Sequence, residues 1–136
     1  MKPLKISRVT ILADGASLSN PGPAAIGAIV KSGQGENLVQ ISRRIGRATN
    51  NQAEYQALIA ALEEAVKLGA SEVDIKLDSE LLVKQLSGQY RVKAKGLKPL
   101  YQKVRILLGR LSGFTINHIS SRRNSEAHRL AHMALR

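Results

Sequence analysis

Three acidic residues, Asp14, Glu54 and Asp78, are the strongest candidates for chemistry in this sequence. The chain has only 10 Asp and Glu residues against 21 Lys and Arg. If the three carboxylates converge, they form a negative centre. Bound cations are the least costly way to relieve the repulsion among the three charges. Oxygen ligands suit a hard cation such as Mg²⁺ or Mn²⁺. The three residues therefore predict a divalent metal site.

The charge of the whole chain indicates the partner. A formal net charge of +11 in 136 residues favours a polyanion, with an acidic protein as the weaker alternative. The absence of Cys excludes a disulfide framework, thiol catalysis and Cys-based metal sites. Two metals about 4 Å apart can activate water and stabilise a leaving oxygen. Metal-dependent cleavage of a nucleic acid is therefore the leading hypothesis.

Each carboxylate also has a simpler interpretation. Asp14 and Asp78 each close a predicted strand, where Asp is often only a turn former or a helix cap. Glu54 stands three residues after Asn51, so the pair could form a capping box with Asn51 as the N-cap. The convergence of all three at one sheet edge is what favours a functional role.

The hydrophobic pattern predicts the elements that must position these residues. Period-two alternation predicts strands over residues 9–14, 24–30, 38–45, 72–77 and 114–119, and helical spacing predicts helices over 51–68, 79–86, 97–111 and 124–135. The order βββαβααβα predicts an α/β fold with a five-stranded mixed sheet flanked by helices. The length favours a single domain over residues 1–136. In such a sheet Asp14 and Asp78 end neighbouring strands, where ligand sites of α/β sheets lie.

Several ordered motifs resemble the type 1 ribonuclease H family, in its compact form without a separate hybrid-binding domain. They are Asp14-Gly15-Ala16-Ser17, Asn20-Pro21-Gly22-Pro23, Ala48-Thr49-Asn50-Asn51-Gln52-Ala53-Glu54-Tyr55 and Leu77-Asp78-Ser79-Glu80. The similarity continues through residues 96–101 and 123–131, so it spans nearly the whole chain. The match is specific because the motifs occur together and in order.

The resemblance implies an enzyme that cuts the RNA strand of RNA/DNA hybrids with Mg²⁺ or Mn²⁺, leaving 5′-phosphate and 3′-hydroxyl ends. It implies that Asp14 bridges two metal ions, that Glu54 and Asp78 each complete one side, and that a metal-bound water is the nucleophile. Recognition of RNA requires contacts to 2′-hydroxyls. By resemblance, the residues that contact the hybrid are Gly15, Ala16, Ser17, Asn50, Asn51 and Gln52. The residues that hold a phosphate of the DNA strand are Asn20, Arg47, Thr49 and Ser79.

The sequence departs from the family at its fourth acidic residue, because His128 stands where the motif Ala-Asp-x-Leu-Ala has Asp. Glu126 lies about 200° away around a helix and is a poor substitute. Three alternatives stay open: His128 ligates a metal and favours Mn²⁺, acts through water or as a proton shuttle, or is a spectator in an impaired enzyme. A direct or water-mediated metal role is favoured because the other three carboxylates are retained. A zinc pair with His132 is disfavoured, and His118 is expected to be structural.

The basic stretch from Arg91 to Lys98 is the other departure, because residues 89–96 form a shorter link than the basic insertion of many bacterial family members. Its lysines either contact phosphate or form a solvated face.

Two other functions compete with hybrid cleavage. One is a catalytically impaired module that binds hybrids or double-stranded RNA, which only His128 supports. The other is a junction resolvase or integrase of the same superfamily, which residues 20–23 and 50–54 disfavour.

Partners and location follow as expectations. Double-stranded RNA is a second possible partner, and a monomer is the family norm. The first eight residues lack the apolar run of a signal peptide, and no stretch reaches ~18 apolar residues, so we expect no membrane association and a cytoplasmic location.

Overall fold

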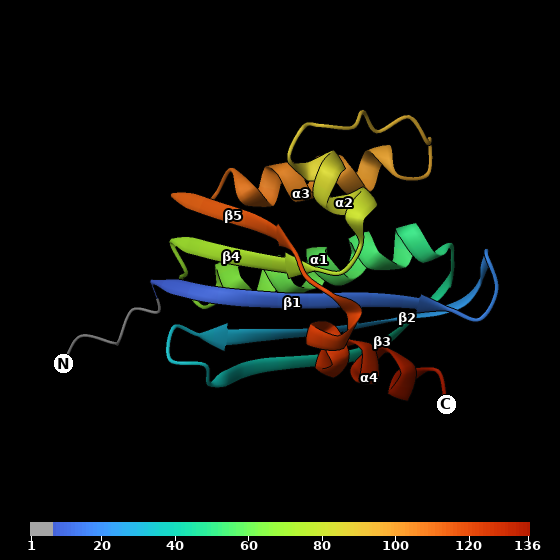
Figure 1. The fold of residues 1–136 in the computed structure, drawn as a ribbon, viewed down its shortest axis with the longest axis horizontal. Helices are drawn as coiled ribbons and strands as arrows, with labels where there is room; N and C mark the ends of the chain where they lie inside the picture. The colour runs from blue at the N-terminus through green and yellow to red at the C-terminus, as the bar shows by residue number, and fades with distance from the viewer. Residues whose placement is uncertain (1–6) are drawn as a thin grey trace.

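Five strands form one mixed sheet in the computed structural model, which describes residues 7–136 (Figure 1). The strands are β1 (Arg8–Ser17), β2 (Gly22–Ser32), β3 (Asn37–Ala48), β4 (Glu72–Leu77) and β5 (Gly113–His118). The helices are α1 (Asn50–Lys67), α2 (Glu80–Leu86), α3 (Lys98–Leu108) and α4 (Ser125–Ala134), and a 3₁₀ turn, η1 (Ser121–Asn124), precedes α4. The predicted α/β fold and its order of elements are confirmed. The expectation for the first eight residues falls mostly outside the described part.

The strand order is β3-β2-β1-β4-β5. The first three strands are an antiparallel meander, whereas β4 runs parallel to both β1 and β5. Helix α1 makes the crossover that a parallel β4 requires. This arrangement places β1 and β4, the strands that carry or precede Asp14 and Asp78, side by side in the middle of the sheet.

Asp14 does not close its strand, contrary to the prediction of a strand over residues 9–14. β1 continues to Ser17 because its last residues still pair with β2, from Gly15 opposite Ile26 to Ser17 opposite Ala24. Its pairing with β4 ends at Ala13 opposite Leu77. Asp14 is therefore the first residue of β1 beyond the parallel pairing, which is why it still lies near Asp78.

The start of α1 differs from the prediction in a way that concerns Glu54. The N-cap is Thr49, whose hydroxyl accepts from Gln52 N at 3.1 Å, while the Gln52 side chain accepts from Thr49 N at 2.9 Å. The prediction of a capping box between Asn51 and Glu54 is therefore wrong, because Thr49 and Gln52 form that motif two residues earlier. Glu54 lies in the next turn of the helix, where capping does not use its carboxylate.

The bounds of β4 and the end of α2 are as predicted, and the other element ends differ from the predicted ones by one to three residues. β2 and β3 are longer than predicted because their pairing continues into the turns, and α3 is shorter because it ends at Leu108 with Gly109 as its C-cap. Gly69, predicted to end α1, has a φ of +79°, the left-handed conformation that glycine adopts after a helix.

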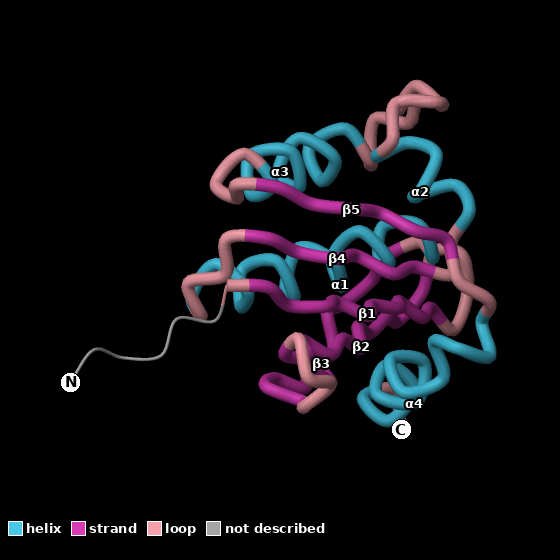
Figure 2. Tube along the Cα trace, turned by 60° about the vertical axis from the view of Figure 1, so that its left-hand side comes forward, coloured by secondary structure: helices cyan, strands magenta, loops and turns pink. Residues whose placement is uncertain are grey.

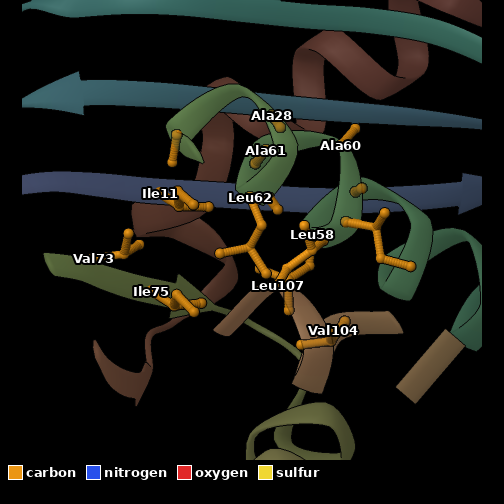
Figure 3. Packing of buried hydrophobic residues seen from close by; sticks show 14 of the residues in the cluster. Ile11, Ala28, Leu58, Ala60, Ala61, Leu62, Val73, Ile75, Val104 and Leu107 are labelled. Carbon is orange, nitrogen blue, oxygen red and sulfur yellow. The ribbon is translucent and has the colours of Figure 1, made fainter. Parts of the chain in front are cut away.

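The main core lies between the sheet and the helices α1, α2 and α3. Figure 3 shows Ile11 of β1 and Ile75 of β4 facing Leu58 and Leu62 of α1, with Leu107 of α3 beside them. Helix α4 packs on the other face of the sheet, apart from the other three helices (Figure 2). None of the helices within residues 7–136 is long and apolar enough to cross a membrane.

Candidate active site

Asp14, Glu54 and Asp78 come from three elements to one place. Asp14 lies in β1, Glu54 in α1, and Asp78 directly after β4. Each offers a carboxylate oxygen, and these three oxygens all lie within 4.8 Å of one another. Asp14 is buried, and the other two are half-buried. The structure thus brings together the three carboxylates that the sequence singled out.

Gly15 explains how α1 comes close enough for Glu54 to reach Asp14. A Cβ atom at Gly15 would lie 2.3 Å from Ala53 C and 2.4 Å from Glu54 N, so no larger residue fits between β1 and the helix backbone. The resemblance gave Gly15 a role in contacting the hybrid. The packing reason is additional, and it acts directly on the geometry of the carboxylates.

The electrostatics of this cluster are unfavourable when all three groups are ionised. Burial raises the pKa of Asp14 to about 6, with the charge of Asp78 adding to the rise and the His128 contact opposing it. Burial raises the pKa of Glu54 to about 7, opposed by a hydrogen bond from Ser79 and supported by the charges of Asp14 and Asp78. A bound cation would offset both burial and repulsion, so these oxygen donors fit a hard divalent metal.

His128 contacts the cluster at Asp14. Its Nδ1 lies 2.9 Å from Asp14 Oδ2, and its side chain is 59% exposed. Its ring also lies against that of His132, with 4.2 Å between the ring centroids. The set of mutually close ligand atoms found within residues 7–136 contains the three carboxylates and not His128.

The neighbouring candidates lie elsewhere. The Glu126 carboxylate pairs with Lys31 at 3.5 Å, so it is not directed to the cluster. His118 Nε2 lies 3.3 Å from the Asp78 backbone oxygen, which agrees with a structural role. Burial and the charges of His128 and Arg136 lower the pKa of His132.

Asn124 is a residue of this region to which the sequence assigned no role. Its side chain is 1% exposed, and its Nδ2 donates to Ala13 O at 2.9 Å. It therefore ties β1, one residue before Asp14, to the start of α4, which carries His128. Its Oδ1 is buried without a hydrogen-bond partner among the described residues. The only sign of this in the sequence is its place four residues before His128.

The structure gives contacts or exposure for each of the residues expected to bind the DNA phosphate. Asn50 N donates to Asn20 Oδ1 at 3.0 Å, which joins the β1–β2 loop to the start of α1, next to Thr49. The Ser79 hydroxyl accepts from Leu82 N at 3.2 Å at the start of α2, and its hydrogen bonding to Glu54 opposes the rise in the pKa of that carboxyl. Arg47 is exposed in β3, opposite Pro23.

The residues expected to contact the hybrid surround the cluster on β1 and α1. Ala16 is buried, and Ser17 is half-buried at the end of β1. Asn51 and Gln52 are half-buried in the first turn of α1. A Cβ at Gly96 would lie 2.7 Å from Gln52 Nε2, so the basic stretch also comes close to this turn.

Comparison with known proteins decides the family. Residues 12–134 match the family described as reverse transcriptase-like. The chain is also 42% identical to a protein of Halobacterium salinarum named ribonuclease HI. The 135 aligned residues make up 99% of this chain and 68% of that protein. The chain belongs to the ribonuclease H family.

Solved structures of ribonuclease H proteins superimpose closely on this fold. The N-terminal RNase H domain of a Mycobacterium tuberculosis protein is 43% identical, with a TM-score of 0.92 over 95% of this chain and 99% of that one. An RNase H1 isolated from compost, in complex with an RNA/DNA hybrid, is 37% identical, with a TM-score of 0.88 over 93% of this chain and 95% of that one. The chain spans only 35% of the length of the mycobacterial proteins it matches.

Membership of the ribonuclease H family implies dependence on a divalent metal. The cluster of Asp14, Glu54 and Asp78 is the group of metal-ligating side chains found in residues 7–136. This chain of the ribonuclease H family therefore contains an oxygen-rich, partly buried cluster that suits a hard divalent metal.

Proposed function

We propose that this chain is an endoribonuclease that hydrolyses the RNA strand of RNA/DNA hybrids. The observation that carries the proposal is the convergence of Asp14, Glu54 and Asp78 within 4.8 Å in a ribonuclease H fold. The name of the Halobacterium salinarum relative and the hybrid-bound compost enzyme support it. The reaction adds water across the bond from phosphorus to the 3′ oxygen, leaving a 5′-phosphate and a 3′-hydroxyl.

The residues that would hold two divalent cations are Asp14, Glu54 and Asp78, with His128 beside Asp14. Bound there, such cations supply an activated water and stabilise the leaving oxygen. Mg²⁺ and Mn²⁺ both suit carboxylate oxygens, and the imidazole of His128 favours Mn²⁺.

Other side chains of the protein support the carboxylates and recognise the substrate. His128 Nδ1 contacts Asp14 Oδ2, so it fixes the orientation of the central carboxylate. The Ser79 hydroxyl lowers the pKa of Glu54 and so favours the ionised form that binds metal. Asn51 and Gln52, in the first turn of α1, offer amide groups that both donate and accept hydrogen bonds, which recognition of 2′-hydroxyls requires.

Cleavage of a labelled RNA/DNA hybrid in Mg²⁺ and in Mn²⁺ tests the proposal, with double-stranded RNA and single-stranded RNA as further substrates. We expect Asp14→Asn to lower the rate roughly a thousandfold, or about 4 kcal/mol of transition-state stabilisation. Asp74→Asn is the matched control, since Asp74 pairs with Thr115 and Arg8 away from the cluster. The proposal is wrong if neither metal supports cleavage, or if Asp14→Asn keeps the wild-type rate.

A catalytically impaired module that binds hybrids is the second candidate, and His128 is the feature that favours it. His128→Asp separates the two candidates, with His132→Asp, one turn further along α4, as the matched control. We expect His128→Asp to lower the Mg²⁺ concentration for half-maximal rate about tenfold and to change the Mn²⁺ requirement less. An inactive wild type that gains activity through His128→Asp would establish the impaired module. Loss of activity in both metals would show that the imidazole is part of the mechanism.

Double-stranded RNA as a second substrate and a monomeric state are further parts of the proposal. The first is an arm of the cleavage experiment, and size-exclusion chromatography with light scattering tests the second.

A further inference from the structure

The segment that joins β5 to α4 is bonded to both strands that lead to the aspartates of the cluster. It comprises residues 119–124, and Figure 1 shows it passing over β4 and β1 on its way to α4. Ile119 N donates to Leu77 O at 2.9 Å. Asn124 Nδ2 donates to Ala13 O at 2.9 Å. These two carbonyls belong to the residues directly before the two aspartates, so one short segment holds the backbone next to both.

Pairing within the sheet does not itself fix the spacing of the two aspartates. The parallel pairing of β1 with β4 ends at Ala13 opposite Leu77, so Asp14 has no register partner on β4. Asp14 still pairs with β2, and Asp78 follows the end of β4, outside any strand. A metal site needs its ligands placed to within roughly 0.5 Å. Contacts beyond the strand pairing must therefore set this spacing, and residues 119–124 supply two of them.

Asn124 does not do what an Asn at the start of a helix ordinarily does. It is the N-cap of α4, yet its side chain makes no capping hydrogen bond. Asn124 is buried, its Nδ2 is engaged by Ala13 O, and its Oδ1 has no hydrogen-bond partner within residues 7–136. A buried oxygen without a partner costs stability, and an apolar side chain of similar size would avoid that cost. Neither capping nor stability accounts for Asn124, whereas its bond to β1 does.

We infer that Asn124 is a positioning residue of the metal site, which holds the backbone at Ala13 so that Asp14 keeps its distance from Asp78. The inference rests on the proposed function, because that function gives the carboxylates their cations. The Ala13 carbonyl and the Asp14 nitrogen belong to one rigid peptide plane, so a bond that fixes the carbonyl also fixes where Asp14 begins. Loss of a contact that orients a metal ligand weakens metal binding by roughly 10- to 100-fold.

Mn²⁺ binding by the protein without substrate tests the inference, measured from the electron paramagnetic resonance signal of free Mn²⁺. Asn124→Leu removes the amide donor and keeps most of the volume of the side chain, whereas Asn124→Ala removes both. Val104→Ala is the control for loss of stability alone, because Val104 is buried in the core on α3. Urea unfolding ranks the stability of the three variants.

We expect both Asn124 variants to raise the Kd for Mn²⁺ roughly tenfold, and Val104→Ala to leave it unchanged. Asn124→Leu should be more stable than Asn124→Ala because it leaves less of a cavity, although the two variants should bind Mn²⁺ equally weakly. Hybrid affinity in a chelator should stay the same, since no basic contact changes. The loss of Mn²⁺ affinity should persist in a His128→Ala background, because the bond to Ala13 acts on Asp14 without His128.

Other outcomes overturn the inference. Mn²⁺ affinity that follows stability across the three variants means a general structural role for Asn124. A loss that disappears in the His128→Ala background means that Asn124 acts by placing His128 instead. A wild type that binds no Mn²⁺ has no metal site to position. Cleavage of hybrid by the wild type is measured separately, so Mn²⁺ binding that depends on Asn124 without any cleavage would support the inference and contradict the proposed function.

Discussion

At the scale of single residues, the candidate metal site is a set of carboxylates in an electrostatically unfavourable environment. Asp14 and Glu54 have pKa values of about 6 and about 7, in both cases chiefly because they are buried. A protein gains nothing in stability from such a cluster. The cluster favours metal binding instead, because ionised, partly desolvated oxygens bind a cation more strongly than solvated ones do.

The stability of the metal-free protein should therefore depend on Glu54. Its pKa is about 7 in the folded chain and 4.5 ordinarily, so the folded state holds this proton more tightly than the unfolded state. The contribution of Glu54 is neutral below pH 4.5, becomes unfavourable as the pH rises, and is fully unfavourable above pH 7. We expect Glu54→Gln to raise the stability at pH 8 by roughly 2 to 3 kcal/mol and to change it little at pH 4.

Urea unfolding at the two pH values, in a chelator, measures this difference. Glu63→Gln serves as the control, because Glu63 lies further along α1 and pairs with Lys103 at 3.8 Å. An equal effect of Glu54→Gln at both pH values would contradict the burial argument. Added Mn²⁺ should reverse the order, stabilising the wild type more than the variant, because the metal binds the ionised carboxylate.

Single residues also show where prediction from sequence stops. Asp14, Glu54 and Asp78 are identifiable because acidic residues are few and their motifs are ordered. The capping box was misassigned because Asn51 and Thr49 are both good N-cap residues, and only the backbone decides between them. Asn124 has no sequence pattern that reveals its burial, since its bond to Ala13 O spans 111 residues.

At the scale of elements, the site depends on how closely two helices approach β1 and β2. Gly15 admits α1 on one face, and Gly27 admits α4 on the other, where a Cβ would lie 2.1 Å from Ala127 O. Gly27 is the register partner of Asp14, so α4 crosses directly beside the cluster. The Ser42 hydroxyl, donating to Leu130 O at 2.6 Å, and Arg44 Nε, donating to Ala134 O at 2.7 Å, fasten the rest of α4 to β3.

Gly27→Ala should therefore displace α4. The new methyl group meets backbone atoms of the helix, Ala127 O at 2.1 Å and Ala131 N at 2.5 Å, which cannot turn aside as a side chain can. We expect a loss of about 3 kcal/mol in the free energy of unfolding, and a weaker contact between His128 and Asp14. Gly33→Ala is the control, since a Cβ there has no neighbour within 4 Å and should cost under about 0.5 kcal/mol.

Urea unfolding measures the first effect, and the Mn²⁺ concentration for half-maximal cleavage measures the second. If Gly27→Ala is as stable as Gly33→Ala, the packing of α4 against β2 is looser than its backbone contacts indicate.

The elements themselves were predictable where periodicity is strong. The order βββαβααβα and the mixed sheet follow from the change between periods of two and 3.6 along the chain. The ends were less predictable, because pairing with β2 extends β1 three residues past Asp14. Pairing between strands decides where such strands end, and the pattern of a single sequence does not reveal that pairing.

At the scale of the whole molecule, charge is divided between a basic exterior and an acidic centre. In the proposed function, the net charge of +11 attracts a nucleic acid, but the phosphate to be cleaved must come beside three carboxylates. Without metal, the basic exterior therefore attracts the nucleic acid, while the acidic centre repels the phosphate. Hybrid affinity in a chelator should report the repulsion, because the basic contacts remain and the cations that screen the centre are removed.

Asp14→Asn should accordingly bind a blunt hybrid more tightly than the wild type in a chelator at pH 7.5. One unit charge about 5 Å from a phosphate costs roughly 0.8 kcal/mol even at the dielectric constant of water, which is about fourfold in affinity. The difference should vanish at pH 5, because the pKa of Asp14 is about 6 and the wild-type carboxyl is then mostly protonated.

The log–log salt slope, about 0.9 per phosphate contact of a duplex, should stay the same, since no basic contact changes. Fluorescence anisotropy at the two pH values measures both quantities, with Asp74→Asn on the neighbouring strand β4 as the control for loss of a carboxylate away from the cluster. If Asp14→Asn binds no more tightly than the wild type at pH 7.5, the scissile phosphate does not approach the carboxylates until metal is bound, and the metals recruit the phosphate rather than only screening it.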